Sequence, residues 1–179
     1  MSTEPASPLD FLLTEIVKAL NAKLFYAAIC LALTIPDVCS VAETDDEDMN
    51  FKIQKRYVPW CDSWVKSFTQ LTSLDLWALR GGVIHKGQTF GHPKERFERV
   101  IFILPFAGNE FQITTKWSSN ADPVCMISVE AFCKGMIDSA NNWKMATKDN
   151  AIVQRNLEGL LRVRPHGYQG SVAGLPVIA

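Results

Sequence analysis

Residues 72–87 read TSLDLWALRGGVIHKG, and this stretch contains the signals that divide the chain into helices. Thr72 followed three residues later by Asp75 is typical of a helix start, because each can bond the exposed amide groups of the first turn. Gly87 can end the helix, since glycine adopts the left-handed conformation without steric cost. The apolar residues between them recur at helical spacing. A helix over about 73–87 is predicted.

The chain before this stretch shows the same kinds of signal. A Ser-Pro-Leu-Asp start at 7–10 predicts a long helix over about 9–33, and Thr-Ile-Pro-Asp at 34–37 predicts a second, shorter helix to about residue 43. A third helix is predicted over about 51–69. Pro59 lacks an amide hydrogen and clashes with the preceding turn, so this helix must kink or start near Val58.

The pattern changes after Pro93. Residues 99–106 and 110–117 are rich in β-forming residues and are separated by a plausible turn, which predicts a β-hairpin over about 99–117, with 123–128 as a further candidate strand. Helical spacing returns from Val129 and continues, with or without a break, to Leu157. The fold class is therefore mainly α, formally α+β, with one domain over 1–164 and an extended tail over 165–179.

Composition supports a single globular domain of 179 residues, with 47% hydrophobic and 21% charged residues. The net charge of −1 combines −7 over residues 1–50 (two basic, nine acidic), +5 over 51–100 (nine basic, four acidic) and +1 over the remainder (seven basic, six acidic). A basic central third can attract an anion such as phosphate, or can simply pair with the acidic N-terminal part.

Cysteine usage and the absence of a leader pattern bound the location of the protein. The five cysteines are odd in number, lie in apolar patterns and show no metal-ligand spacing with histidine, so we expect a reducing compartment and no metal or cofactor. The N-terminus is acidic, and the longest apolar run, 24–36, is shorter than the roughly 20 residues of a membrane span. These features predict a cytoplasmic protein with no membrane partner.

Gly81 and Gly82 are unusual inside a predicted helix, because each glycine costs about 1 kcal/mol relative to alanine. Their missing side chains can admit another backbone or expose peptide groups to a ligand. Arg80 and His85 flank the pair, and five residues on a regular helix separate them by about 140°. We therefore expect them not to sit side by side in a regular helix, and to line one cavity if a second copy faces this helix across a two-fold axis.

An arginine and a histidine on one pocket support phosphate chemistry. The histidine can accept a proton from a ribose 2′-hydroxyl or protonate the leaving oxygen, while the arginine holds the phosphate. Arg80 and His85 are thus the candidate catalytic residues, and Gly81, Gly82 and Lys86 the candidate binding residues. An alternative explanation needs no chemistry, because basic side chains near a helix C-terminus are stabilised by the helix dipole.

The segment LRGGVIHKG resembles the R-x4-6-H motif of HEPN-like proteins, specifically a bacterial group. The resemblance covers about residues 24–145. It includes LALTIPDVCSVAE at 31–43, RYVPWCDSWV at 56–65, RVIFILPF at 99–106 and SVEAFCKGMIDSANNW at 128–143. It implies a HEPN-like helical bundle with a small β-hairpin before the last long helix, and commonly a homodimer with the motif near the dimer cleft.

The resemblance also implies function. Active HEPN-like proteins cleave RNA without a metal, and many serve toxin–antitoxin or phage-defence systems, where an antitoxin protein is a further partner. Carried over by position, Arg80 binds phosphate and His85 is the general acid or base. Active members often have a polar residue after the arginine, where this chain has Gly81. An inactive member that binds nucleotides or RNA, or only dimerises and scaffolds partners, therefore remains the alternative.

Overall fold

The structure is a computed structural model that describes residues 7–45, 52–65, 69–89, 97, 99–105, 115–117, 124–168 and 170–179. Helices dominate these residues, which confirms the mainly helical class. The six helices of the described part are α1 (Pro8–Asn21), α2 (Phe25–Ala42), α4 (Ile53–Trp64), α5 (Ser73–Lys86), α6 (Val129–Ala146) and α7 (Ala151–Leu157).

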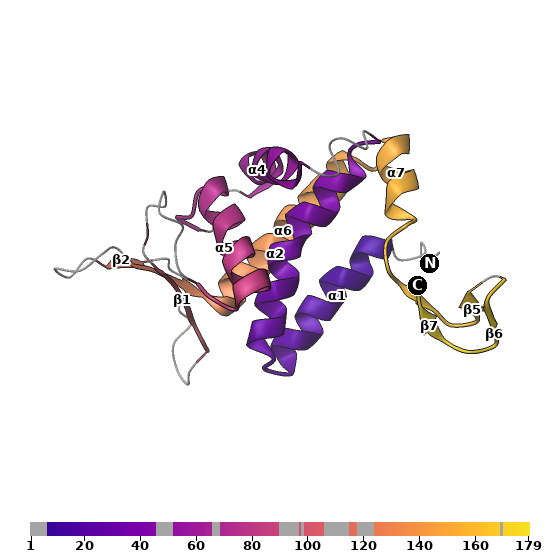
Figure 1. The fold of residues 1–179 in the computed structure, drawn as a ribbon, viewed down its shortest axis with the longest axis horizontal. Coiled ribbons are helices and arrows are strands. Elements are labelled where there is room, and N and C mark those ends of the chain that lie inside the picture. The colour runs from indigo at the N-terminus through magenta and orange to yellow at the C-terminus, as the bar shows by residue number, and fades with distance from the viewer. Residues whose placement is uncertain are drawn as a thin grey trace.

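Helix α2 is the centre of the molecule. It contacts α1, α4, α5, α6 and α7, and it runs beside α6 through the middle of the helical body (Figure 1). Its inward residues include Ala28, Ala32, Leu33 and Ile35, all fully buried. The buried Tyr57 hydroxyl of α4 donates to the Leu33 carbonyl oxygen at 3.2 Å, which fixes α4 against α2. A helix enclosed in this way has to be apolar on most of its surface.

The apolar character of α2 also meets a simple criterion for a membrane span. Its 18 residues have a mean hydropathy of 1.8, so by length and composition the helix is able to cross a membrane. Half of this segment is buried inside the protein. Its contacts with five other helices account for the same composition in a core helix.

The predicted helix starts at Ser7 and Thr72 are confirmed. The Asp10 carboxylate accepts a hydrogen bond from the Ser7 amide at 2.9 Å. The Asp75 carboxylate accepts from the Thr72 amide at 2.7 Å, and the Thr72 hydroxyl oxygen accepts from the Asp75 amide at 3.1 Å. The predicted end of α5 is also confirmed, since Gly87 has a left-handed φ of 64°.

The predicted boundary between the first two helices is wrong, although the start near residue 9 and the end near residue 43 agree with the structure. The break lies at residues 22–24, where Lys23 has a left-handed φ of 59°, and not at residue 34. Helix α2 continues through Pro36, whose ring is buried. The two helices need a turn at 22–24 to pack against each other as an antiparallel pair, and this packing overrides the local signal at 34–37.

Helix α4 contains Pro59 in its interior. It runs from Ile53 to Trp64 with Pro59 inside it, so the predicted start near residue 51 is close and the alternative start near Val58 is wrong. Burial of Tyr57, Trp60 and Cys61 around the proline stabilises a helix that is unfavourable locally. The end predicted at residue 69 is also too late, because the helix ends at Trp64.

The three strands before α6 do not form the predicted hairpin. Strand β3 (Val124–Ser128) lies in the centre, parallel to β1 (Arg99–Ile103) and antiparallel to β2 (Thr115–Trp117), so the order is β1-β3-β2. Cys125 and Ile127 of β3 are buried, and the strand leads directly into α6. The central strand β3 is thus more buried than its parallel neighbour β1. The turn expected between 106 and 110 lies outside the described residues.

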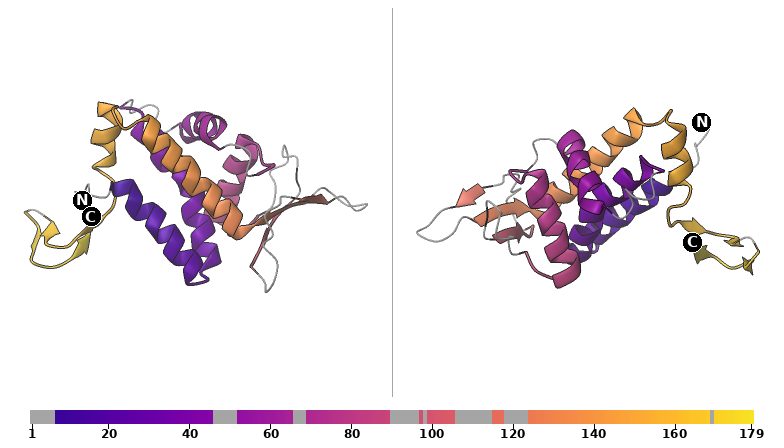
Figure 2. Two further views of the ribbon diagram at one scale, coloured as in Figure 1. Left: turned by 180° about the vertical axis from the view of Figure 1, so that it is seen from behind. Right: turned by 45° about the horizontal axis from the view of Figure 1, so that its top comes forward.

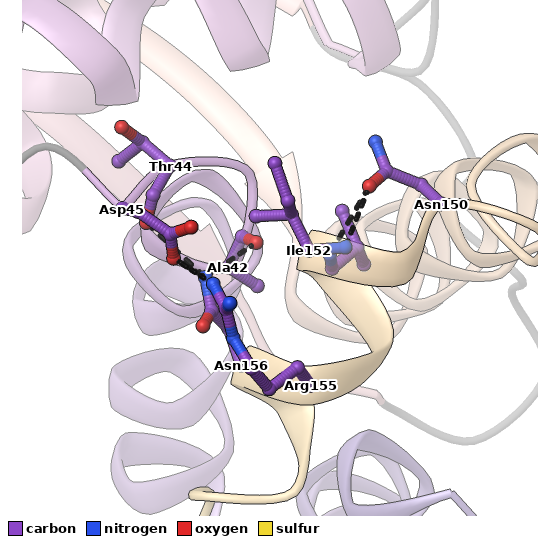
Figure 3. A network of polar contacts seen from close by, with 8 residues as sticks. Ala42, Thr44, Asp45, Asn150, Ile152, Arg155 and Asn156 are labelled. Carbon is purple, nitrogen blue, oxygen red and sulfur yellow. Dashed lines mark hydrogen bonds and ion pairs between the residues drawn. The ribbon is translucent and has the colours of Figure 1, made fainter.

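Helix α7 closes the end of α2 (Figure 3). The Asn156 side-chain amide donates to the carbonyl oxygens of Ala42 at 3.2 Å and Thr44 at 3.1 Å. Arg155 forms an ion pair with Asp45 beside this contact. The last turn of a helix leaves carbonyl groups without partners inside the helix, and α7 supplies donors for them.

The C-terminal residues form an arm of short strands. Strand β4 (Val163–Arg164) pairs with β7 (Val177–Ile178), and β5 (Gly167–Tyr168) pairs with β6 (Val172–Ala173). The arm extends from one end of the helical body, and the three-stranded sheet lies at the opposite end (Figures 1 and 2). The expected extended tail is thus folded on itself.

Candidate functional site

Arg80 is the centre of the candidate site, and its partner on α2 is Asp37. The Arg80 Nε–H donates to Asp37 Oδ2 at 2.9 Å, with side-chain exposures of 14% and 16%. Asp37 is the only charged residue in the sequence of α2, and a carboxylate that is mostly buried there requires a cation. The Arg80 guanidinium also lies 5.4 Å from the centre of the Trp77 ring, which covers it.

Arg80 and His85 lie side by side, contrary to the expectation for a regular helix. Arg80 Nη1 is 2.9 Å from His85 Nε2, and α5 is continuous from Ser73 to Lys86. The rotation of about 140° between the two positions holds for the backbone, but the long arginine side chain spans it. A second copy is not needed to bring these two groups together.

The direction of this contact is fixed by chemistry. A guanidinium group only donates, so His85 Nε2 is the acceptor and carries no proton in this arrangement. Nε2 of His85, the atom expected to act as a base, is therefore occupied by Arg80.

Charges from three helices meet at this point. Asp37 interacts electrostatically with Arg80 and His85 of α5 and with Arg56 of α4. Burial raises the pKa of the Asp37 carboxyl, and the positive charges of Arg80 and Arg56 oppose this shift. Charged side chains of α2, α4 and α5 therefore converge at Asp37.

The candidate binding residues occupy the end of α5. A Cβ added to Gly81 would meet no atom within 4 Å, outside its own helix and chain neighbours, among the described residues. Gly82 is partly exposed, and its carbonyl oxygen accepts from the Gln88 amide at 3.0 Å. Lys86 is exposed in the last turn. Close packing inside this chain therefore does not explain Gly81.

Tyr26 joins α2 to the end of α5. Its hydroxyl donates to the Val83 carbonyl oxygen at 3.0 Å. The Tyr26 hydroxyl oxygen also lies 3.9 Å from the position that a Cβ on Gly87 would take. This contact ties the last turn of α5, which carries His85, to the start of α2.

Sequence reasoning identified Arg80 and His85 but missed Asp37. Asp37 was interpreted as part of a helix start, although a lone carboxylate in an apolar helix is a signal in itself. The structure brings Asp37, Arg80 and His85 together, while Lys86 is exposed at the end of the same helix.

Burial makes four of the five cysteines unsuited to nucleophilic chemistry. All five are free, and Cys39, Cys61, Cys125 and Cys133 are buried. Burial raises the pKa of the Cys133 thiol to about 12, and it also raises the pKa of Cys39 and Cys61. In the described part of the chain, no group of three or more His, Cys, Asp or Glu side chains is placed to hold a metal ion.

Comparison with known proteins adds no relative. No family model matches the chain, and no match is found among the curated proteins or the solved structures.

Proposed function

We propose that this chain is a HEPN-like, RNA-directed protein that acts as a metal-independent endoribonuclease of the toxin–antitoxin or phage-defence type. The observation that carries the proposal is the convergence of the Arg80 guanidinium and the His85 imidazole, with Asp37 holding the arginine from α2. The order of segments that resembles this family adds support.

The proposed reaction uses each group once. The His85 Nε2 takes the proton of a ribose 2′-hydroxyl, and the 2′-oxygen attacks the adjacent phosphorus. The bond from phosphorus to the 5′-oxygen breaks, and this oxygen leaves with a proton from a second imidazole, the protonated His85 of a second copy of the chain. Arg80 stabilises the charge that grows on the phosphate oxygens. The products are a 2′,3′-cyclic phosphate and a 5′-hydroxyl end.

We further propose a cytoplasmic homodimer formed through α5, with an antitoxin protein as a further partner. Leu74, Ala78, Gly81 and His85 follow one another at intervals of three or four residues, so they share one face of the helix. Leu74 is 56% exposed, and the space above Gly81 is open within this chain. Such a face allows a second α5 to approach closely and to bring a second imidazole to the leaving group.

Cleavage of a labelled RNA in the presence of EDTA tests the proposal. We expect product ends with a 2′,3′-cyclic phosphate and no cleavage of a 2′-deoxy substrate. In Arg80→Ala and His85→Gln we expect the cleavage rate to fall by a factor of at least about 100. His166→Gln is the matched control, since His166 is exposed on the arm. Equal cleavage by wild type and His85→Gln would show that the proposed chemistry is wrong.

A second candidate is a non-catalytic helical dimerisation or nucleotide-binding domain with a decayed motif. The observation that favours it is Gly81, which places open space where a catalytic pocket would gain from a polar side chain. In this case Gly81→Leu disrupts the dimer in light scattering, while His85→Gln changes neither assembly nor RNA integrity. RNA cleavage that depends on His85 excludes this candidate.

A further inference from the structure

We propose that Arg80 and His85 form a pair that an oxyanion separates, so that binding of a phosphate-like group at Arg80 is coupled to proton uptake at His85. The inference rests on the proposed function only in placing the anion at the same two residues. The ligand class is a tetrahedral oxyanion, either a phosphodiester of RNA or a free phosphate.

The first step concerns the donors of Arg80. A guanidinium binds an oxyanion best through two parallel N–H groups. The edge that contains Nε is occupied by Asp37 Oδ2 at 2.9 Å, and the Trp77 ring lies over one face. The edge that remains is formed by Nη1 and Nη2. Because Nη1 already donates to His85 Nε2 at 2.9 Å, a two-pronged anion must displace the imidazole.

The second step concerns the proton. His85 Nε2 accepts from Arg80, so it cannot hold a proton while the contact exists. Once an oxyanion takes Nη1, Nε2 is released beside a negative charge. A protonated imidazole can then donate to the anion, which stabilises the charged form. Anion binding and protonation of His85 therefore favour each other.

The third step concerns the other charged groups around the pair. Asp37 faces it from α2, Arg56 and Tyr57 from α4, and Lys86 follows His85 on α5. Tyr57 is fully buried and its pKa is raised, so it stays neutral. The carboxylate of Asp37 favours protonation of His85, while Arg56, Arg80 and Lys86 oppose it. An added anion changes this balance toward the imidazolium.

Sulfate is the probe, because it stays fully ionised through the range in which histidine titrates. The nitrogen and proton resonances of His85 are followed by NMR from pH 5 to 9, in sodium sulfate and in sodium chloride of equal ionic strength. In chloride at the upper end of this pH range, the contact with Arg80 predicts that the ring proton of His85 lies on Nδ1. Sulfate is expected to raise the titration midpoint of His85 by about one unit, which corresponds to a tenfold gain in proton affinity.

Two variants and one internal control make the result specific. Arg80→Lys keeps the charge but lacks a two-pronged edge, so we expect its His85 midpoint to be the same in both salts. In wild type the coupling predicts that sulfate binds more tightly at low pH, where His85 is protonated. In His85→Gln we expect sulfate affinity to lack this dependence on pH. The midpoint of His166 on the arm should not depend on the salt.

The outcomes separate this inference from the proposed function. If sulfate leaves the His85 midpoint unchanged, or fails to bind, the inference is overturned even where RNA cleavage depends on both residues. If the midpoint rises and RNA stays intact, the coupling stands and the ribonuclease proposal fails. A larger shift with a 2′-deoxy dinucleoside phosphate than with inorganic phosphate assigns the anion to RNA, and the reverse assigns it to free phosphate.

Discussion

Asp37 links burial to charge at the site. Its carboxylate is mostly buried and bonded to the Arg80 Nε–H, while Oδ1 has no hydrogen-bond partner among the described residues. Burial thus leaves the Oδ1 oxygen without a hydrogen bond, while the Oδ2 oxygen is paired with the arginine. Its role is to hold the arginine in place, because it touches Arg80 and leaves the Nη edge for other groups.

Substitution of Asp37 separates charge from shape. Asp37→Ala leaves a mostly buried guanidinium without its carboxylate, and we expect the free energy of unfolding to fall by about 1–3 kcal/mol. Asp37→Asn keeps an oxygen acceptor at the same place and should cost less. Urea denaturation measures both. Equal losses in the two variants would show that the hydrogen bond to Arg80 contributes little.

The raised pKa of Asp37 gives a pH dependence with a definite sign. Burial raises the pKa of Asp37 despite the nearby arginines, so the folded chain binds this proton at higher pH than the unfolded chain. The resulting stabilisation is complete below the unfolded pKa of about 3.9 and is lost as the pH rises through the folded pKa. We therefore expect wild type to gain stability relative to Asp37→Asn as the pH falls from 7 toward 4. Urea denaturation at several pH values checks this, and a difference that shrinks on acidification contradicts it.

Gly81 weakens α5 without serving a contact inside this chain. A Cβ at this position meets open space, so Gly81→Ala should raise the free energy of unfolding by about 0.5–1 kcal/mol through helix propensity. Ala78→Gly is the matched reverse exchange on the same helix and should lower it by a similar amount. Thermal unfolding of both variants measures this. A loss of stability in Gly81→Ala would mean that the added methyl group meets an obstacle.

At the scale of elements, the sequence predicts those helix ends that are determined by interactions within one turn. Ser7, Thr72 and Gly87 act through hydrogen bonds and dihedral angles within one turn, and all three helix ends were predicted. The turn at Lys23 and the continuation through Pro36 depend on packing between helices, and both were missed. The parallel pairing of β1 with β3 joins residues 25 positions apart, which a hairpin pattern does not reveal.

The candidate site likewise has features that the local sequence predicts and features that depend on tertiary contacts. Arg80 and His85 are visible as a motif because they lie on one helix. Their direct contact depends on side-chain reach, and the bond to Asp37 joins residues 43 positions apart. Spacing along one helix carries no information about either. Recognition of a lone charge in an apolar helix is the signal that points to Asp37.

The contact between α7 and α2 tests how strongly the helix end is stabilised. Asn156→Ala removes the donors to the carbonyl oxygens of Ala42 and Thr44 (Figure 3), and we expect a loss of about 1–2 kcal/mol. Asn142→Ala is the matched control, because Asn142 is exposed on α6. Urea denaturation compares the two. Equal effects would mean that α7 does not stabilise the end of α2.

At the scale of the whole molecule, stability and exposure are distributed unevenly. The core lies where α2 meets the surrounding helices, and Leu157 at the end of α7 still belongs to it, with 2% exposure. Beyond this point no described residue of 161–179 is buried. Leu161, Leu175 and Ile178 are 63–67% exposed. The arm thus extends from a body that is already complete (Figure 2).

Removal of the arm should leave the helical body intact. A chain ending at Leu160 loses two short ladders, and two-stranded ladders of this size add little stability by themselves. We expect the melting temperature to change by less than about 2 °C, since 1 kcal/mol corresponds to roughly 2–4 °C at this size. Leu157→Ala, in contrast, removes a buried side chain and should cost about 2–5 kcal/mol, while Leu161→Ala should have almost no effect. Calorimetry of the three variants measures these changes. A large drop on truncation would require the arm to pack against the helices or against a second copy, because its exposed apolar residues contribute stability only where something covers them.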